Sequence, residues 1–202
     1  MRCVSDHYFT AEPASDAERR HVPVRLAGQD VQVQVAAGIF SPAGIDKGTR
    51  VLLDELPPAP GADLLDLGCG WGPLALTAAL QNPATTVWAV DVNARALDLV
   101  RRNAAALGVA DRVRACTPDE VPDDVRFAAL WSNPPIRVGK SVLHDMLRRW
   151  LTRLVPGADG GWLVVQKNLG SDSLARWIES DVGLPVRRAS SSKGFRVLHV
   201  TR

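Results

Sequence analysis

The sequence feature that most constrains the fold is a short apolar run that ends in three closely spaced glycines. Gly68, Gly70 and Gly72 follow the run Asp63–Leu67, and a helix-like segment comes next. Glycines allow a sharp turn and a close approach of the backbone to a ligand, while the first turn of a helix offers free N–H groups. The pattern therefore predicts a strand, a tight turn and a helix that together bind a nucleotide-like cofactor.

A carboxylate about 20 residues further on supports this interpretation. The next apolar run, 87–90, ends at Asp91, and an acid at this point of a doubly wound sheet is suited to two ribose hydroxyls. Glycines alone would also fit a purely structural turn, but the acid favours cofactor binding. The spacing G-x-G-x-G, with Asp66 two residues before it, differs from the dinucleotide pattern G-x-G-x-x-G. NAD is therefore disfavoured, and a nicotinamide-dependent oxidoreductase is the distant alternative.

Strand-like and helix-like segments alternate along the rest of the chain, which is typical of a parallel sheet with helices on both faces. We predict an α/β, Rossmann-like fold with a seven-stranded, mostly parallel sheet and an antiparallel C-terminal hairpin. The predicted strands are 64–67, 86–91, 113–116, 126–131, 161–166, 185–189 and 195–200, and the predicted helices are 73–81, 94–107, 141–154 and 173–180.

The N-terminal part is predicted to be an extension of this domain. Residues 1–60 would comprise an arm, a β-hairpin and a covering helix, and residues 61–202 the main domain. The arm, 1–21, is polar and irregular, while alternation around a turn at 27–30 indicates the hairpin. Asp46 is a candidate N-cap for the covering helix. At 202 residues and 46% hydrophobic content, the chain needs no second domain.

Composition argues against several classes of protein. Cys3, Cys69 and Cys116 show no C-x-x-C spacing, so neither a metal site nor a disulfide framework is expected. The N-terminus is too acidic for a signal peptide, and no apolar run approaches the ~18 residues of a membrane helix. We expect a cytoplasmic protein, a monomer or weak dimer, that does not associate with membranes.

Charge is unevenly distributed along the chain. Residues 1–130 contain 12 Lys/Arg and 17 Asp/Glu, whereas residues 131–202 contain 12 and 5, so the two parts carry −5 and +7. The basic part would attract a polyanion such as RNA if its cations share one face. Ordinary solvated helix faces explain the charge equally well.

A second motif, Asn133-Pro134-Pro135-Ile136, follows the predicted strand 126–131. It resembles the [N/D/S]-P-P motif of methyltransferases that modify nitrogens conjugated to a π-system. By that resemblance, the Asn133 amide oxygen and the Pro134 carbonyl would each accept one N–H of the target and favour a pyramidal nitrogen. A proline loop with an asparagine cap would be the default interpretation in isolation. Its place after the fourth core strand favours catalysis.

The motifs together resemble one family. Gly38-Ile39-Phe40-Ser41 with Asp46 and Gly48, the glycine turn, Asp91-Val92-Asn93 and Ser132-Asn133-Pro134-Pro135 are similar to the RsmC-like ribosomal RNA guanine-N2 methyltransferases. These belong to the class I S-adenosylmethionine (SAM) methyltransferases of the small-domain type. The resemblance spans residues 38–200. It implies a Rossmann-like fold, SAM as methyl donor and a guanine exocyclic amine in ribosomal RNA as target.

The resemblance also implies roles for individual residues. Asp66 and the glycines would surround the methionyl part of SAM, Asp91 would bind its ribose, and Asp119 would reach its adenine. Phe40 and Thr49 would close over the cofactor, although core packing and a helix position explain them as well. The implied cofactor-binding set is Asp66, Gly68, Cys69, Gly70, Gly72, Asp91, Val92, Asp119 and Asn133, and the implied catalytic set is Asn133, Pro134, Pro135 and Ile136.

The sequence departs from the family in three respects. Ile136 replaces an aromatic residue, Arg137 replaces a histidine found in guanine-modifying members, and no second copy of the domain is present in the N-terminal part. The identity of the base therefore stays open. Arg137 and Lys140 would contact RNA phosphates. N-methylation of a protein glutamine, or SAM binding without turnover, are the alternatives.

Overall fold

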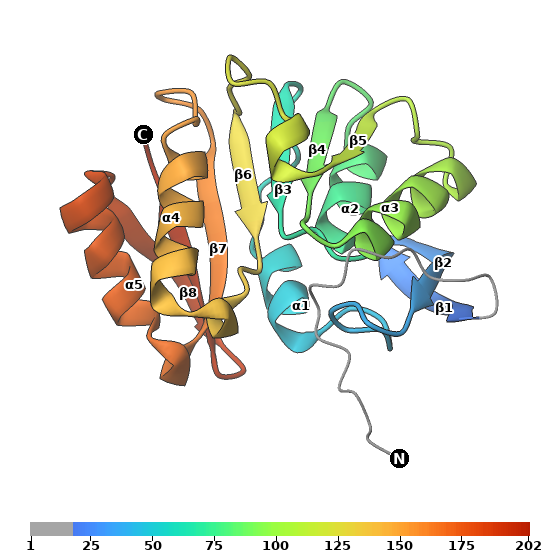
Figure 1. Cartoon of the computed structure of the whole chain (residues 1–202), viewed down its shortest axis with the longest axis horizontal. Helices are drawn as coiled ribbons and strands as arrows, with labels where there is room; N and C mark the ends of the chain where they lie inside the picture. Colours follow the sequence, from blue (N-terminus) through green and yellow to red (C-terminus); the bar gives the residue numbers. More distant parts are fainter. Residues whose placement is uncertain (1–17) are drawn as a thin grey trace.

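Strand β3 (Asp63–Leu67) is an interior strand of the main sheet, and its apolar side chains are buried on both faces. In the computed structural model, which describes residues 18–202, the seven-stranded sheet has the order β5-β4-β3-β6-β7-β9-β8 (Figure 1). The pairs from β5 to β7 are parallel, and β9 is antiparallel to both of its neighbours. This order confirms the predicted fold class. The other strands are β4 (Thr86–Val90), β5 (Val113–Cys116), β6 (Ala129–Ser132), β7 (Gly160–Gln166), β8 (Val186–Ser192) and β9 (Phe195–Val200).

Helices cover both faces of this sheet and divide the core into two clusters. One cluster includes residues of α1 (Lys47–Leu53), α2 (Pro73–Gln81) and α3 (Ala94–Ala106), and the other includes residues of α4 (Lys140–Leu151) and α5 (Ser171–Trp177). Alternation along β3 sends Leu64 to the first cluster and Leu65 to the second, as the period of two in a strand requires. Short helical turns follow three strands: η2 (Pro118–Glu120), η3 (Ile136–Val138) and η4 (Lys167–Leu169). The π-helical η5 (Ile178–Val182) continues α5.

A separate two-stranded hairpin, β1 (Arg19–Leu26) and β2 (Gln29–Ala36), packs against α3. Its turn contains only Ala27 and Gly28, both with positive φ, which is the geometry that favours a two-residue hairpin. The predicted turn at 27–30 is therefore too long. Residues 19–21 belong to β1 rather than to an arm, and residues 1–17 of the predicted arm lie outside the described residues.

The buried side chain of Asn103 joins this hairpin to the glycine turn. Its Oδ1 accepts the backbone N–H of Gln34 (2.7 Å), and its Nδ2 donates to the carbonyls of Gln34 (3.0 Å) and Trp71 (3.2 Å). The amide thereby pairs with both polar groups of one strand residue, as a neighbouring strand would.

Several predicted boundaries differ from the structure; the predicted helix 141–154, for example, is α4 over Lys140–Leu151. Strand β6 begins at Ala129 rather than 126, because the backbone of Phe127 pairs with the segment after α4 instead, through Arg153 and Val155. Strand β8 extends to Ser192 and reaches β9 by a two-residue turn at 193–194. The predicted helix 173–180 is α-helical over Ser171–Trp177 and continues as the π-helical η5. The predicted boundary at residue 60, between the N-terminal part and the main domain, stays a prediction. Helix α1 of the N-terminal part packs against α2, β7 and β9 of the main domain.

Candidate functional site

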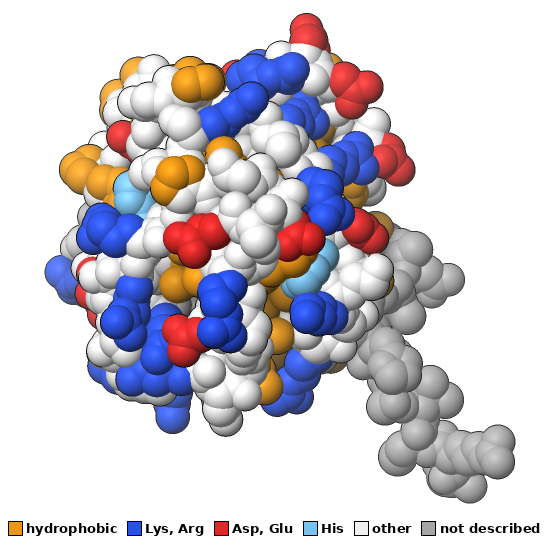
Figure 2. Space-filling view, turned by 90° about the vertical axis from the view of Figure 1, so that its left-hand side faces the viewer, with side chains coloured by type: hydrophobic (Ala, Val, Ile, Leu, Met, Phe, Trp, Pro, Cys, Tyr) orange, Lys and Arg blue, Asp and Glu red, His pale blue; other side chains and the backbone are white. Residues whose placement is uncertain are grey.

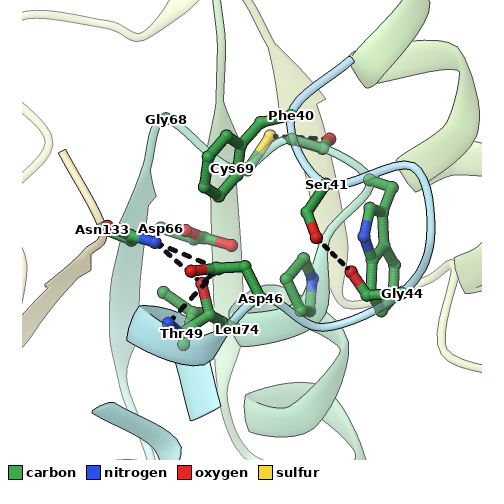
Figure 3. A pocket seen from close by; sticks show the side chains of 13 residues that line it. Phe40, Ser41, Gly44, Asp46, Thr49, Asp66, Gly68, Cys69, Leu74 and Asn133 are labelled. Carbon is green, nitrogen blue, oxygen red and sulfur yellow. Dashed lines mark hydrogen bonds between the residues drawn. The ribbon is translucent and has the colours of Figure 1, made fainter. Parts of the chain in front are cut away.

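A pocket lies where β3 and β6 end, between three segments that are distant in sequence (Figure 3). The loop before α1, the glycine turn with the start of α2, and the residue after β6 each provide part of its wall. The lining residues are Phe40, Ser41, Gly44, Asp46, Thr49, Asp66, Gly68, Cys69, Gly70, Trp71, Pro73, Leu74 and Asn133. Five of the predicted cofactor-binding residues therefore meet in one pocket: Asp66, Gly68, Cys69, Gly70 and Asn133.

The glycine turn has the backbone geometry that only glycine adopts easily. Gly68, Gly70 and Gly72 have φ values of +74°, +56° and +95°. A Cβ at Gly70 would meet no atom within 4 Å, so the turn faces open space there. A Cβ at Gly72 would lie 3.1 Å from Val100, so this glycine serves the packing of α2 against α3. Gly72 does not line the pocket.

Asp66 is a buried carboxylate on the pocket wall. Its side chain accepts the N–H of Ala75 in the first turn of α2 (2.9 Å), and the residue is 1% exposed. Burial raises the pKa of Asp66 to about 8, with the Ala75 N–H opposing this shift. The acid is therefore mainly neutral at pH 7 until a cation enters.

Asp91 connects the end of β4 to the glycine turn. One of its oxygens accepts the Gly70 N–H and the other accepts the Asn93 N–H, both at 2.9 Å. Burial raises the pKa of Asp91, and these N–H groups oppose the shift. The neighbouring Val92 is 53% exposed. These two residues lie beside the pocket and do not line it.

Asn133 is held by two residues of the α1 segment. Its Nδ2 donates to Asp46 Oδ2 (3.1 Å) and to Thr49 Oγ1 (3.0 Å), as Figure 3 shows. Asp46 is also the N-cap of α1, as predicted, and accepts the Gly48 and Thr49 N–H groups. The preceding Ser132 donates its hydroxyl to the carbonyl of Leu67 (2.7 Å), which ties the end of β6 to the end of β3.

The two prolines form a tight turn next to the glycines. Pro135 Cδ lies 3.9 Å from the position of a Cβ on Gly68. The carbonyl of Pro134 accepts the N–H of Ile136 (2.8 Å), so one of its two lone pairs is already used. The Ile136 side chain packs against the cluster beneath α4.

Asp119 lies away from this pocket wall. Its carboxylate is 91% exposed and forms an ion pair with Arg149 of α4 (3.1 Å). The predicted contact with adenine stays a prediction for this residue.

The sequence indicates Asp46 as a helix cap and as part of the family resemblance, and Phe40 and Thr49 stay outside the predicted set. Ser41 is likewise part of the resemblance without a predicted role, and Gly44, Trp71, Pro73 and Leu74 have no predicted role. The capping pattern at Asp46 locates the start of α1, but no local pattern indicates its contact with Asn133, 87 residues away. The resemblance of Gly38-Ile39-Phe40-Ser41 was the available signal for the loop that closes this side of the pocket.

The pocket suits SAM on the chemistry of its walls. SAM carries a sulfonium and an ammonium, and the buried carboxylates Asp66 and Asp91 have no ion-pair partner within residues 18–202. Open space at Gly70 gives a ligand close access to the backbone. The same stretch of chain contains no group of three or more His, Cys, Asp and Glu able to hold a metal ion.

Charged side chains divide the carboxyl edge of the sheet into two halves. Acids lie at or after the ends of β3, β4 and β5, and exposed cations that form no ion pair within the described residues follow β6, β7 and β8. The backbone N–H of Lys167 donates to the carbonyl of Gly194 (2.9 Å), so the cations after β7 and β8 lie at one place. Figure 2 views the molecule from the side of α5 and β8, and on that side Lys and Arg side chains lie in both the upper and the lower part. The acids are Asp66, Asp91, Asp119 and Glu120, and the cations, called the basic rim below, are Arg137, Lys140, Lys167 and Lys193.

Other basic residues have structural roles instead. Arg153 is 8% exposed and stacks on Phe127 and Trp150, and Arg149 pairs with Asp119. Arg196 pairs with Asp172. The basic C-terminal part is therefore only partly a single surface. Among residues 18–202, no helix is long and apolar enough to cross a membrane.

The chain has clear relatives among known proteins. The family model described as "Methyltransferase small domain" matches residues 30–199. The uncharacterized protein YbxB of Bacillus subtilis is 33% identical over 200 residues, which cover 96% of this chain and 98% of YbxB. Ribosomal RNA small subunit methyltransferase C of Pseudomonas aeruginosa is 33% identical over 197 residues, 95% of this chain and 57% of that protein. The chain thus spans about half the length of these ribosomal RNA methyltransferases.

Solved structures share the fold. The 16S rRNA N2 guanine methyltransferase RsmC of T. thermophilus, solved with AdoMet and guanosine, superposes with a TM-score of 0.79 over 94% of this chain and 52% of that one, at 23% identity. TrmN from Thermus thermophilus gives a TM-score of 0.57 at 25% identity, over 75% of this chain and 46% of that one.

Proposed function

Because this chain belongs to the methyltransferase small-domain family and is a SAM-dependent methyltransferase, we propose that it methylates an exocyclic amine of an RNA base. N2 of guanine in ribosomal RNA is the proposed target. The observation that carries the proposal is the Asn133 carboxamide, which is held beside the pocket with its Nδ2 bound to Asp46 and Thr49. The relatives named for ribosomal RNA methylation support the class of substrate.

The residues of the site suit transfer to a conjugated amine. SAM supplies the methyl group as an electrophile on its sulfonium. Asp66, Asp91 and the glycine turn are proposed to bind the cofactor, and Asn133 Oδ1 and the free lone pair of the Pro134 carbonyl to accept the two N–H groups of the amine. Such an amine is a poor nucleophile because its lone pair is delocalised. Two acceptors outside the plane of the base favour the pyramidal form, and they bind it more strongly as the transition state is approached.

No strong base is required by this arrangement, because methyl transfer depends mainly on the alignment of the reacting groups. The prolines support the alignment. They remove two N–H donors that would compete for the acceptors, and Pro135 stiffens the turn. Ile136 offers an apolar contact in place of an aromatic platform.

The basic rim favours RNA over a protein substrate. Its four cations lie along the half of the sheet edge on which Asn133 stands, while Asp66 lines the proposed site of the cationic cofactor and Asp91 lies beside it. A polyanion is attracted to the first half and repelled from the second. An unpaired base would enter beside Asn133 while its flanking phosphates contact the rim.

Transfer of a labelled methyl group tests the proposal. The protein is incubated with labelled SAM and, separately, with unmodified ribosomal subunits, naked ribosomal RNA, tRNA and ribosomal proteins, and labelled RNA is digested to nucleosides. We expect N2-methylguanosine from a ribosomal RNA fraction. Label in the protein fraction would instead indicate glutamine methylation, and another labelled nucleoside would assign a different base. If no fraction is labelled although SAM binds, the proposal of turnover fails.

A further inference from the structure

We propose that Asp46, assisted by Thr49, is a positioning residue that decides which end of the Asn133 carboxamide faces the target. It holds Nδ2 inward and leaves Oδ1 as the group presented outward. The proposal rests on the proposed function, in which Oδ1 must accept an N–H from the amine.

The hydrogen bonds of the carboxamide fix its nitrogen end. Its Nδ2 lies 3.1 Å from Asp46 Oδ2 and 3.0 Å from Thr49 Oγ1. These two oxygens are hydrogen-bonded to each other, because the Thr49 hydroxyl donates its own hydrogen to Asp46, so one Asn133 N–H is shared between them. Within residues 18–202, no donor meets Oδ1 of Asn133. The oxygen end of the carboxamide is therefore free to accept a hydrogen bond.

A carboxylate makes this orientation unambiguous. The oxygen and nitrogen of an amide have nearly the same shape, so only their partners determine which is which. An ionised carboxylate can only accept. Turning the Asn133 amide over would lose a charge-assisted hydrogen bond and set Oδ1 against the anion of Asp46. A neutral donor-acceptor partner such as a hydroxyl or an amide would permit both orientations.

Asp46 is itself fixed by the covering helix. Its Oδ1 accepts the N–H of Gly48 (2.8 Å) and its Oδ2 accepts that of Thr49 (3.3 Å), which caps α1. Val51 and Leu52 of α1 are 2% and 0% exposed, so the helix is anchored in the core. A Cβ at Gly48 would lie 3.0 Å from the ring of Phe195 in β9, so the cap fits closely against the sheet. The N-terminal extension thereby determines which end of the Asn133 carboxamide, after β6, faces outward.

The consequence for catalysis is that the acceptor is oriented before any substrate arrives. A preorganised dipole needs no rearrangement during the reaction, which is the condition under which it stabilises a transition state best. Asp46 does not contact the reacting amine and acts only through Asn133.

The variant Asp46→Asn tests this directly. Asparagine is as good an N-cap as aspartate, so α1 should persist. To keep the bond from Gly48, the introduced asparagine must place its oxygen there and its NH₂ group toward Asn133. Two donors would then oppose each other, and the Asn133 amide should turn over. We expect kcat to fall about 10²-fold, the effect of removing one transition-state hydrogen bond. The melting temperature and the affinity for S-adenosylhomocysteine should change little.

Asp54→Asn is the matched control. Asp54 is exposed and follows α1 at its other end, so this change removes the same charge from the same helix without reaching Asn133. Its kcat should remain that of the wild type. At position 49, Thr49→Ser keeps the hydroxyl and should lose much less activity than Thr49→Val, which has no hydroxyl to accept from Asn133 or to donate to Asp46.

A second measurement does not depend on turnover. In ¹⁵N-labelled protein, the side-chain NH₂ resonances of Asn133, identified by their disappearance in Asn133→Ala, should exchange slowly with water in the wild type. They should exchange faster in Asp46→Asn, where the NH₂ group faces outward. Wild-type kcat in Asp46→Asn, or an unchanged exchange rate, would overturn the proposal. If the wild type methylates no substrate, the proposed function fails, but the exchange measurement still decides how the amide is oriented.

Discussion

At the scale of single residues, the buried Asp66 and the half-buried Asn133 are suited to bind different kinds of group. Asp66 has one backbone N–H partner and too little solvation for a charge, so its pKa rises to about 8. The nitrogen of Asn133 is bound by Asp46 and Thr49, and its Oδ1 meets no donor within the described residues. The first is suited to a cation and the second to a neutral N–H donor, which matches the two reactants of an amine methylation.

Replacing Asn133 by alanine should remove the acceptor without disturbing the cofactor pocket. We expect kcat to fall about 10²- to 10³-fold, because one preorganised hydrogen bond to the transition state is removed. The affinity for SAM, measured by calorimetric titration, should change less than about threefold if the cofactor is held mainly by the glycine turn and its acids. Full activity in this variant would remove Asn133 from the catalytic set.

The raised pKa of Asp66 predicts a pH-dependent stability. In the folded state Asp66 holds its proton up to about pH 8, whereas its ordinary pKa is 3.8. Between these values the folded state binds one more proton than the unfolded chain, so this group makes the protein less stable as the pH rises from about 4 to about 8. Asp66→Asn does not titrate. Urea unfolding across this range should therefore show the variant gaining stability relative to the wild type.

The comparison uses a difference between two proteins because Asp91 also has a raised pKa. Its contribution is present in both proteins and largely cancels. Parallel stability curves for wild type and variant would mean that Asp66 is already ionised in the folded protein.

At the scale of elements, the site depends on how the ends of neighbouring strands are joined. Asp91 at the end of β4 accepts the Gly70 N–H, and Ser132 at the end of β6 donates to the carbonyl of Leu67 in β3. The glycine turn is thus supported from both sides, on one side by a carboxylate and on the other by a hydroxyl.

Asp91→Ala should loosen this turn as well as remove the proposed ribose acceptor. We expect the affinity for S-adenosylhomocysteine to fall at least about tenfold, the effect of one charge-assisted hydrogen bond. Asp111→Ala, at an exposed acid before β5, is a control that should bind normally. An unchanged titration for Asp91→Ala would exclude the ribose assignment.

The sequence predicts the bounds of a helix or strand correctly where the neighbouring residues alone determine them. The span 73–81 follows from a proline after glycines and coincides with α2, and 113–116 coincides with β5. The predicted start of β6 is three residues early because Phe127 and Ala128 extend the apolar run toward Arg126, while Phe127 in fact pairs with the chain after α4. The bond between Asp46 and Asn133 was not predictable in this way, since it depends on the tertiary arrangement of α1 against β6. Which cations share the basic rim also required the strand order.

At the scale of the whole molecule, the sheet edge has an acidic half and a basic half. The arrangement separates a cationic donor from an anionic acceptor by charge. It also leaves the basic rim free of internal ion pairs within the described residues, so these cations remain available to phosphates.

Reversing the charge of Arg137 and Lys140 together should weaken RNA binding and its dependence on salt. The slope of log K against log salt should decrease by about 0.7 for each phosphate of single-stranded RNA that the protein no longer neutralises. The double change Arg126→Glu with Arg187→Glu, at the amino ends of β6 and β8, serves as the control of equal charge. Equal slopes for both double variants would mean that RNA binding depends only on the net charge of the protein and not on where the cations lie.

The amide of Asn103 also has a consequence for dynamics. It bonds both to the backbone of Gln34 in the hairpin and to the carbonyl of Trp71 in the pocket wall. The hairpin and the wall should therefore open to solvent as one cooperative unit. A ligand that stabilises the pocket wall against opening will then slow deuterium uptake at the Gln34 amide. Strand β2, which lies outside the main sheet, would thus report whether the pocket is occupied.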